Sequence, residues 1–94
     1  MEERGLYPNP FGPMLHIFFS LRVDAAVTVT IYDVAGEPVR RIALDGRAGN
    51  NLVPWPGAND VGGRCASGIY LLQVAAKGVD GTQGQFWDRA AAAR

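Results

Sequence analysis

Turn-forming blocks divide the whole chain into short runs in which apolar and polar residues alternate. Glycine, proline, asparagine and aspartate gather in residues 7–13, 33–37, 45–51, 56–64 and 78–81. These residue types favour turns, because proline fixes φ, glycine reaches positive φ, and Asn and Asp side chains bond to nearby backbone groups. Turn signals spaced in this way are typical of a small β-sandwich, so an all-β fold with about seven strands is predicted.

The runs between the turns have the two-residue period of half-buried strands. The clearest run is 26–34, where Val27, Val29 and Ile31 alternate with threonine and tyrosine. Further strands are predicted at 15–21, 38–44, 52–55, 69–75 and 82–89. Residues 1–94 are expected to form one domain, in which 7–13 is an extended entry segment and the alanine-rich tail, 90–94, is a short helical end or a frayed terminus.

The apolar positions of these strands supply the predicted core. Trp55 and Tyr70 are expected to pack against each other and to place their N–H and O–H groups on backbone carbonyls. The predicted core residues are Ile17, Phe19, Leu21, Val29, Ile31, Trp55, Tyr70, Leu72 and Val74. The predicted turn residues are Asn9, Asp33, Gly36, Gly57, Asn59, Gly62 and Gly68, with Gly36 at positive φ.

Charge and composition exclude several classes of protein. Nine basic and nine acidic residues cancel, so there is no electrostatic basis for binding nucleic acid or anionic lipid. No stretch approaches the roughly 20 apolar residues of a membrane span. The charged start, residues 1–4, is not followed by an apolar region, so no signal peptide is expected. With Cys65 as the single cysteine, an intramolecular disulfide is impossible.

Five blocks in fixed order carry a family resemblance. They are Tyr7-Pro8-Asn9-Pro10-Phe11; Ile17, Phe19 and Leu21; Ile31-Tyr32-Asp33 with Gly36 and Val39; Trp55, Gly57, Asn59 and Gly62; and Ala66, Gly68 and Tyr70. This order resembles the immunoglobulin-like domain family of the flagellar hook-capping protein, and the C-terminal sorting domains of the type IX secretion system share it. The resemblance implies an immunoglobulin-like (fibronectin III-like) antiparallel β-sandwich with no enzymatic activity.

The chain departs from the family pattern in loop 56–64, at the C-terminus and at Cys65, which stands where valine is common. Pro56 and Asn59 stand where the family usually has aspartate, which makes the loop 56–64 a poorer cation site. The C-terminus reads Phe86-Trp87-Asp88-Arg89 and then alanines, whereas sorting domains usually end in a strand with basic residues. The resemblance therefore implies the fold more strongly than it implies the sorting role.

The residues with reactive side chains form no recognisable catalytic or metal-binding set. Asn59 and Asp60 offer only two side-chain ligands, and calcium takes six to eight oxygens. His16 is the only histidine, and Asp33 is expected to accept turn N–H groups. Cys65 is expected to be an inert packing residue, with an intermolecular crosslink as the alternative. No enzymatic activity, metal or cofactor is predicted.

Three aromatic residues are candidate interface residues: Phe18, Phe86 and Trp87. Phe86 and Trp87 point to opposite faces of one strand, so at least one of the three should lie on the surface. Large exposed aromatics on a sandwich favour a partner. The alternative is that the tail or residues 7–13 cover them.

These observations favour a non-enzymatic docking module, an accessory subunit that binds protein subunits of a larger cell-envelope or membrane-associated assembly, such as a secretion, filament, respiratory or photosynthetic complex. It would attach through a sheet face or an edge strand. The first alternative is a C-terminal sorting domain of a larger exported protein, and the second is a carbohydrate-binding module. The resemblance favours the periplasmic or extracellular side of the envelope, and the cytoplasmic side stays open.

Overall fold

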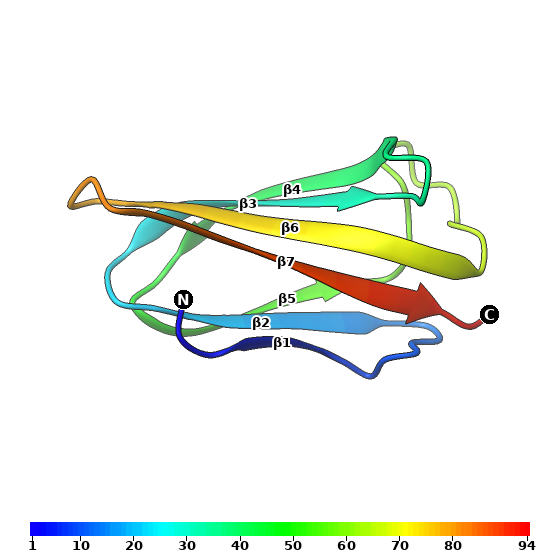
Figure 1. The fold of residues 1–94 in the computed structure, drawn as a ribbon, viewed down its shortest axis with the longest axis horizontal. Helices are drawn as coiled ribbons and strands as arrows, with labels where there is room; N and C mark the ends of the chain where they lie inside the picture. The colour runs from blue at the N-terminus through cyan, green and yellow to red at the C-terminus, as the bar shows by residue number, and fades with distance from the viewer.

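The computed structural model describes residues 1–94 and contains seven strands in two sheets (Figure 1). The strands are β1 (Arg4–Tyr7), β2 (Leu15–Leu21), β3 (Ala25–Tyr32), β4 (Pro38–Gly46), β5 (Gly49–Trp55), β6 (Gly68–Gly78) and β7 (Gln83–Ala92). One sheet has the order β1-β2-β5 and the other β4-β3-β6-β7, and every pairing within them is antiparallel. The predicted immunoglobulin-like β-sandwich is confirmed. No helix is present that could span a membrane.

Alternating burial along the strands builds the core between the two sheets. In β3, every second residue from Ala25 to Ile31 is buried, and its neighbours face outward. The register places Val29 opposite Val74 of β6, and Ile17 of β2 opposite Val53 of β5. Because side chains of a strand alternate between faces, one row of each sheet meets the other in a single apolar layer.

Trp55 lies at the centre of an aromatic cluster and is fully buried. Its ring centroid lies 5.5 Å from that of Phe11 and 5.8 Å from that of Tyr70. Its Nε1–H donates to the carbonyl of Ala58 at 2.9 Å, and the Tyr70 hydroxyl donates to the carbonyl of Ala66 at 2.6 Å. The polar atoms of both aromatic residues therefore have backbone carbonyl partners, in loop segments beside the core.

All the predicted core residues except Leu21 are buried, and Leu21 is only partly so. Leu21 is the last residue of β2 and lies at the end of the sandwich, beside Arg22 and Val23. Its side chain packs against Gly46 of β4 on one side and lines a hollow on the other, so it is covered only in part. The prediction of Leu21 as a core residue needs this correction.

The N-terminal region differs from the sequence prediction. Arg4–Tyr7 forms an edge strand paired with β2, which the charged and glycine-bearing sequence did not indicate. Within the entry segment, Phe11 is fully buried, whereas Tyr7 is half exposed. Edge strands have one neighbour only, so their residues need not show a regular apolar alternation.

The C-terminal tail is neither helical nor frayed. β7 continues to Ala92, paired with Gly68, and both Ala90 and Ala92 are buried. The Phe11 N–H donates to the carbonyl of Ala91, and the Ala93 N–H donates to the carbonyl of Phe11, both at 2.8 Å. The tail is strand because two neighbours satisfy its backbone groups, whereas alanine alone would favour helix.

Trp55→Ala is expected to lower the free energy of unfolding by about 3–5 kcal/mol, because it removes the central ring of the core. Urea denaturation followed by circular dichroism measures the loss. Leu52→Ala is the matched control, since Leu52 lies on the same strand with 53% of its side chain exposed. Equal losses for the two variants would show that Trp55 does not organise the core.

Candidate docking surface

The outer face of the four-stranded sheet carries a group of large side chains, three of them exposed and Tyr32 partly buried. The group consists of Tyr32, Ile69, Leu71 and Trp87 and is called the aromatic patch here. The Trp87 and Tyr32 rings stack, with centroids 5.8 Å apart and an interplanar angle of 27°. They come from β3 and β7, so they meet above the intervening strand β6. Trp87 remains 54% exposed, although it contacts Tyr32.

Strand parity decides which aromatic residue of β7 reaches the surface. Phe86 is 4% exposed and belongs to the core, where the guanidinium of Arg4 lies 5.2 Å from its ring centroid. Phe86 is therefore not an interface residue in this structure. Trp87 points to the opposite face, so among the candidates in this strand it is the one available to a partner.

Phe18 belongs to a second aromatic group, on the outer face of the three-stranded sheet. It is partly buried, with Tyr7 5.8 Å away by ring centroids, and Tyr7 stacks in turn on His16 at 5.1 Å. A Cβ on Gly5 would come within 2.7 Å of the Phe18 ring, so the ring lies directly on this glycine. The β1 strand covers much of Phe18, which makes this face less accessible than the aromatic patch.

His16 stands alone as a candidate ligand. Its Nδ1 is buried and has no hydrogen-bond partner, while its ring rests on Tyr7. No group of three or more His, Cys, Asp or Glu side chains is placed to hold a metal ion. The structure thus places His16 in an aromatic stack.

Asn9 shields part of the β7 edge. Its Nδ2 donates to the carbonyl of Arg89 at 3.0 Å, and its Oδ1 accepts the Ala91 N–H at 2.9 Å. One side chain thus occupies the outward backbone groups that a neighbouring strand would otherwise use. The sequence indicated only a turn at Asn9, because its partners lie 80 and 82 residues away.

Asp60 shields the opposite edge of the same sheet, at β4. Its N–H donates to the carbonyl of Val39 at 3.0 Å, and its carboxylate accepts the Arg41 N–H and an Arg40 guanidinium N–H, each at 3.1 Å. These donors, with the Arg41 N–H first, hold the pKa of Asp60 below its usual 3.8. The sequence offers Asp60 only as a cation ligand, because no local pattern signals a contact with a strand 19 residues away.

The other predicted turn residues hold their own loops. Asn59 Oδ1 accepts the N–H groups of Val61 and Gly63, and Asp33 Oδ1 accepts those of Ala35 and Glu37. The predicted turn glycines, Gly36, Gly57, Gly62 and Gly68, all have positive φ, and Gly68 is also the first residue of β6. Asn59 Oδ1 and Asp60 Oδ1 in loop 56–64 are therefore already engaged with protein donors, which disfavours a calcium site there.

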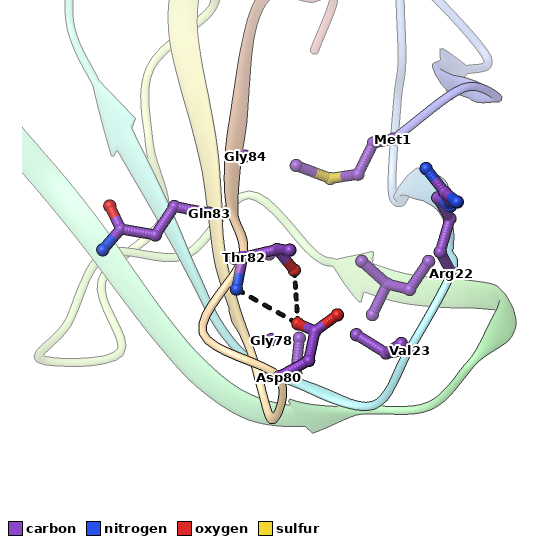
Figure 2. Close-up of a pocket in the computed structure, with 11 residues that line it drawn as sticks. Met1, Arg22, Val23, Gly78, Asp80, Thr82, Gln83 and Gly84 are labelled. Atoms are coloured by element: carbon purple, nitrogen blue, oxygen red, sulfur yellow. Dashed lines mark hydrogen bonds between the residues drawn. The ribbon is translucent and has the colours of Figure 1, made fainter.

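A hollow of about 410 Å³ opens at the hairpin end of the sandwich (Figure 2). Figure 2 shows Asp80 and Thr82 of the β6–β7 hairpin on one side and Met1, Arg22 and Val23 on the other. The Asp80 carboxylate accepts the Thr82 hydroxyl and N–H, which lowers the pKa of Asp80. The Asp80 carboxylate thus stabilises the turn. The residues that line the hollow form no set of groups suited to catalysis.

Cys65 lies against Tyr70 in the core and is 8% exposed. Burial raises the pKa of the Cys65 thiol, and a smaller opposing effect comes from the charge of Arg94. Burial likewise raises the pKa of the Tyr70 hydroxyl. A buried protonated thiol is a poor nucleophile, so this environment favours packing over chemistry.

The profile of the FlgD Ig-like domain matches residues 18–80. Comparison with curated protein sequences gives no match. Among solved structures, FlgD from P. aeruginosa shares 25% identity and a TM-score of 0.68 over 83% of this chain and 61% of its own. PorZ, a surface component of the type IX secretion system of Porphyromonas gingivalis, shares 25% identity and a TM-score of 0.61 over 97% of this chain and 11% of its own.

The fold also matches dimeric latent PorU from Porphyromonas gingivalis, with a TM-score of 0.80 over 95% of this chain and 9% of that one. At 20% identity, this likeness shows the fold alone. The chain spans less than two thirds of each of these solved proteins.

Asp60→Asn is expected to destabilise the protein at neutral pH and to lose this effect in acid. Because the folded-state pKa of Asp60 lies below 3.8, its ionised form stabilises the fold above that pH, and the contribution disappears as the pH falls through the lowered value. Urea denaturation at pH 7 and pH 2.5 measures the difference. Glu37→Gln removes a carboxylate that has no side-chain partner and should change little at either pH. A constant difference between wild type and Asp60→Asn would contradict the edge contact.

Cys65 is expected to react with a maleimide about tenfold or more slowly in the folded protein than in urea, because the reagent needs an exposed thiolate. Mass spectrometry of quenched samples gives the two rates. The control is the double variant Cys65→Ala/Ala66→Cys, which moves the thiol to an exposed neighbour. Similar rates for wild type and this control in the folded state would show that Cys65 is accessible.

Proposed function

The chain belongs to the FlgD Ig-like domain family, and we propose that it is a non-catalytic docking module that joins a larger protein assembly of the cell envelope through its four-stranded sheet. The aromatic patch carries this proposal. Tryptophan and tyrosine are enriched among the side chains that anchor protein interfaces, and Trp87 is 54% exposed. Ile69 and Leu71, which are 44% and 38% exposed, extend the patch along β6.

The edges of this sheet support docking through its face. Asn9 and Asp60 occupy outward backbone groups of β7 and β4, so strand addition is blocked along part of each edge. The face between these edges carries no covering element of the chain. A partner would therefore meet side chains of the face more readily than a free strand edge.

Relatives in multi-protein assemblies support the envelope location. FlgD from Xanthomonas campestris is described in connection with hook capping, which is essential for flagellar assembly, and PorZ as a bacterial surface component of a secretion system. The acidic side chains best placed for chemistry already accept hydrogen bonds, Asp33 and Asp80 from their own turns and Asp60 from Arg40 and Arg41 of β4. These bonds favour a structural role for the three acids.

A sorting domain of an exported protein is the second candidate, favoured by the likeness to PorZ at 25% identity. Fusing this chain to the C-terminus of a secreted reporter, in a bacterium with type IX secretion, would test it. Export that depends on the fused chain would support sorting. A carbohydrate-binding role has less support, because the stack with Tyr32 occupies one face of the Trp87 ring on which a sugar would rest.

Trp87→Ser is expected to leave the fold intact, with about 1 kcal/mol or less of lost stability, and to weaken association with the assembly about tenfold or more. The measurement is co-purification of the chain with its partners from source cells, followed by quantitative mass spectrometry. Leu52→Ser is the matched control, since Leu52 is 53% exposed on the opposite sheet. Loss of partners with Leu52→Ser but not with Trp87→Ser would place docking on the three-stranded sheet and contradict the proposal.

A further inference from the structure

The outer face of the four-stranded sheet has a raised half and a hollow half. The raised half is the aromatic patch. The hollow half lies toward the β6–β7 hairpin and holds about 550 Å³. Small side chains line it, namely Ala26, Thr28 and Ala75, together with longer polar ones, namely Lys77, Gln83 and Gln85.

The strand register arranges this face in three rows across the sheet. The raised row is Arg41, Thr30, Gln73 and Trp87; the middle row is Ala43, Thr28, Ala75 and Gln85; the row in the hollow half is Asp45, Ala26, Lys77 and Gln83. The raised row and the hollow row are thus equally distant from the middle row, each two residues along the strands. A two-fold axis that runs along the middle row, across the strands, would therefore place the raised row of one copy over the hollow row of a second copy.

We propose that the partner of this face is a second copy of the same chain, packed face to face about that two-fold axis. This inference rests on the proposed docking role of the face. The rotation places Trp87 of one copy over Gln83 and the adjacent hollow of the other, and the reverse contact forms at the same time. Such a reciprocal contact, in which the same patch of both copies meets itself, is what an isologous interface requires.

The charges of the face agree with the same axis. Arg41 and Asp45 lie on β4, two residues on either side of Ala43, so each would meet the other residue of the second copy. Neither side chain has a hydrogen-bond or ion-pair partner within the chain, whereas the neighbouring Arg40 is bound to Asp60. Lys77 would face the neutral Gln73. The arrangement therefore creates two opposite-charge pairs and places no like charges opposite each other in these rows.

The contact would extend across the whole width of the sheet, because the three rows cross all four strands. The sheet runs along the longest dimension of the molecule (Figure 1). The twist of each sheet is compatible with face-to-face packing at about 30° between strand directions.

Sedimentation equilibrium of the purified chain and its charge variants tests the proposal. The wild type should sediment at twice 10.1 kDa. Arg41→Asp and Asp45→Arg should each weaken dimerisation about tenfold or more, since each puts like charges opposite one another, and the double variant should restore it. Arg64→Asp reverses an exposed charge away from the face and should dimerise normally. Trp87→Ser should be monomeric.

A wild type that stays monomeric up to about 1 mM overturns the proposal, since a specific face-to-face dimer would form below that concentration. A dimer that survives both single charge reversals also overturns it, because the interface then lies elsewhere. If the chain is monomeric and Trp87→Ser still loses the cellular assembly, the docking role stands and only the identity of the partner is wrong. If Trp87→Ser changes neither measurement, both proposals fail.

Discussion

The packing around Trp55 joins parts of the chain that lie far apart in sequence. Its strand belongs to the three-stranded sheet, Tyr70 belongs to the four-stranded sheet, and Phe11 lies in the segment that bonds to the end of β7. One buried indole therefore holds the two sheets together and fixes the entry segment against them. The buried hydrogen bond to Ala58 also positions the start of loop 56–64, from which Asp60 reaches β4. The core and the shielding of this edge depend on the same contact.

Side chains complete the edges of the sandwich where strands are missing. Asn9 and Asp60 each present a donor and an acceptor to an edge strand, as the backbone of a neighbouring strand would. These contacts oppose strand addition, which is the usual route by which a small β-sandwich associates or aggregates. The face of the four-stranded sheet is left as the accessible apolar surface, and it is here that the exposed tryptophan lies.

The loop chemistry is consistent with a structural protein. Asp33, Asn59 and Asp80 accept N–H groups of their own turns, and Asp60 accepts the Arg41 N–H of β4. The Thr82 hydroxyl and N–H lower the pKa of Asp80, and the Arg41 N–H and the Arg40 guanidinium lower that of Asp60. Hydrogen bonds from nearby donors lower the pKa of a carboxylate and stabilise the loop that holds it. Acid–base catalysis would instead need a titratable side chain without such partners, close to a second titratable group. Membership of the FlgD Ig-like domain family agrees with a structural role for these carboxylates.

The sequence alone determined the all-β architecture, most of the core and the turns, because the alternation of apolar residues and the placement of glycine and asparagine act over a few neighbouring residues. It could not separate Phe86 from Trp87, since two adjacent residues of one strand must face opposite ways and only the pairing with β6 decides which one enters the core. Nor could it reveal Asn9 beside Ala91, the short edge strand β1, or the hollow next to the aromatic patch. These features arise from strand register and from contacts between distant segments, which the tertiary structure sets because local preference carries no information about the neighbouring strand.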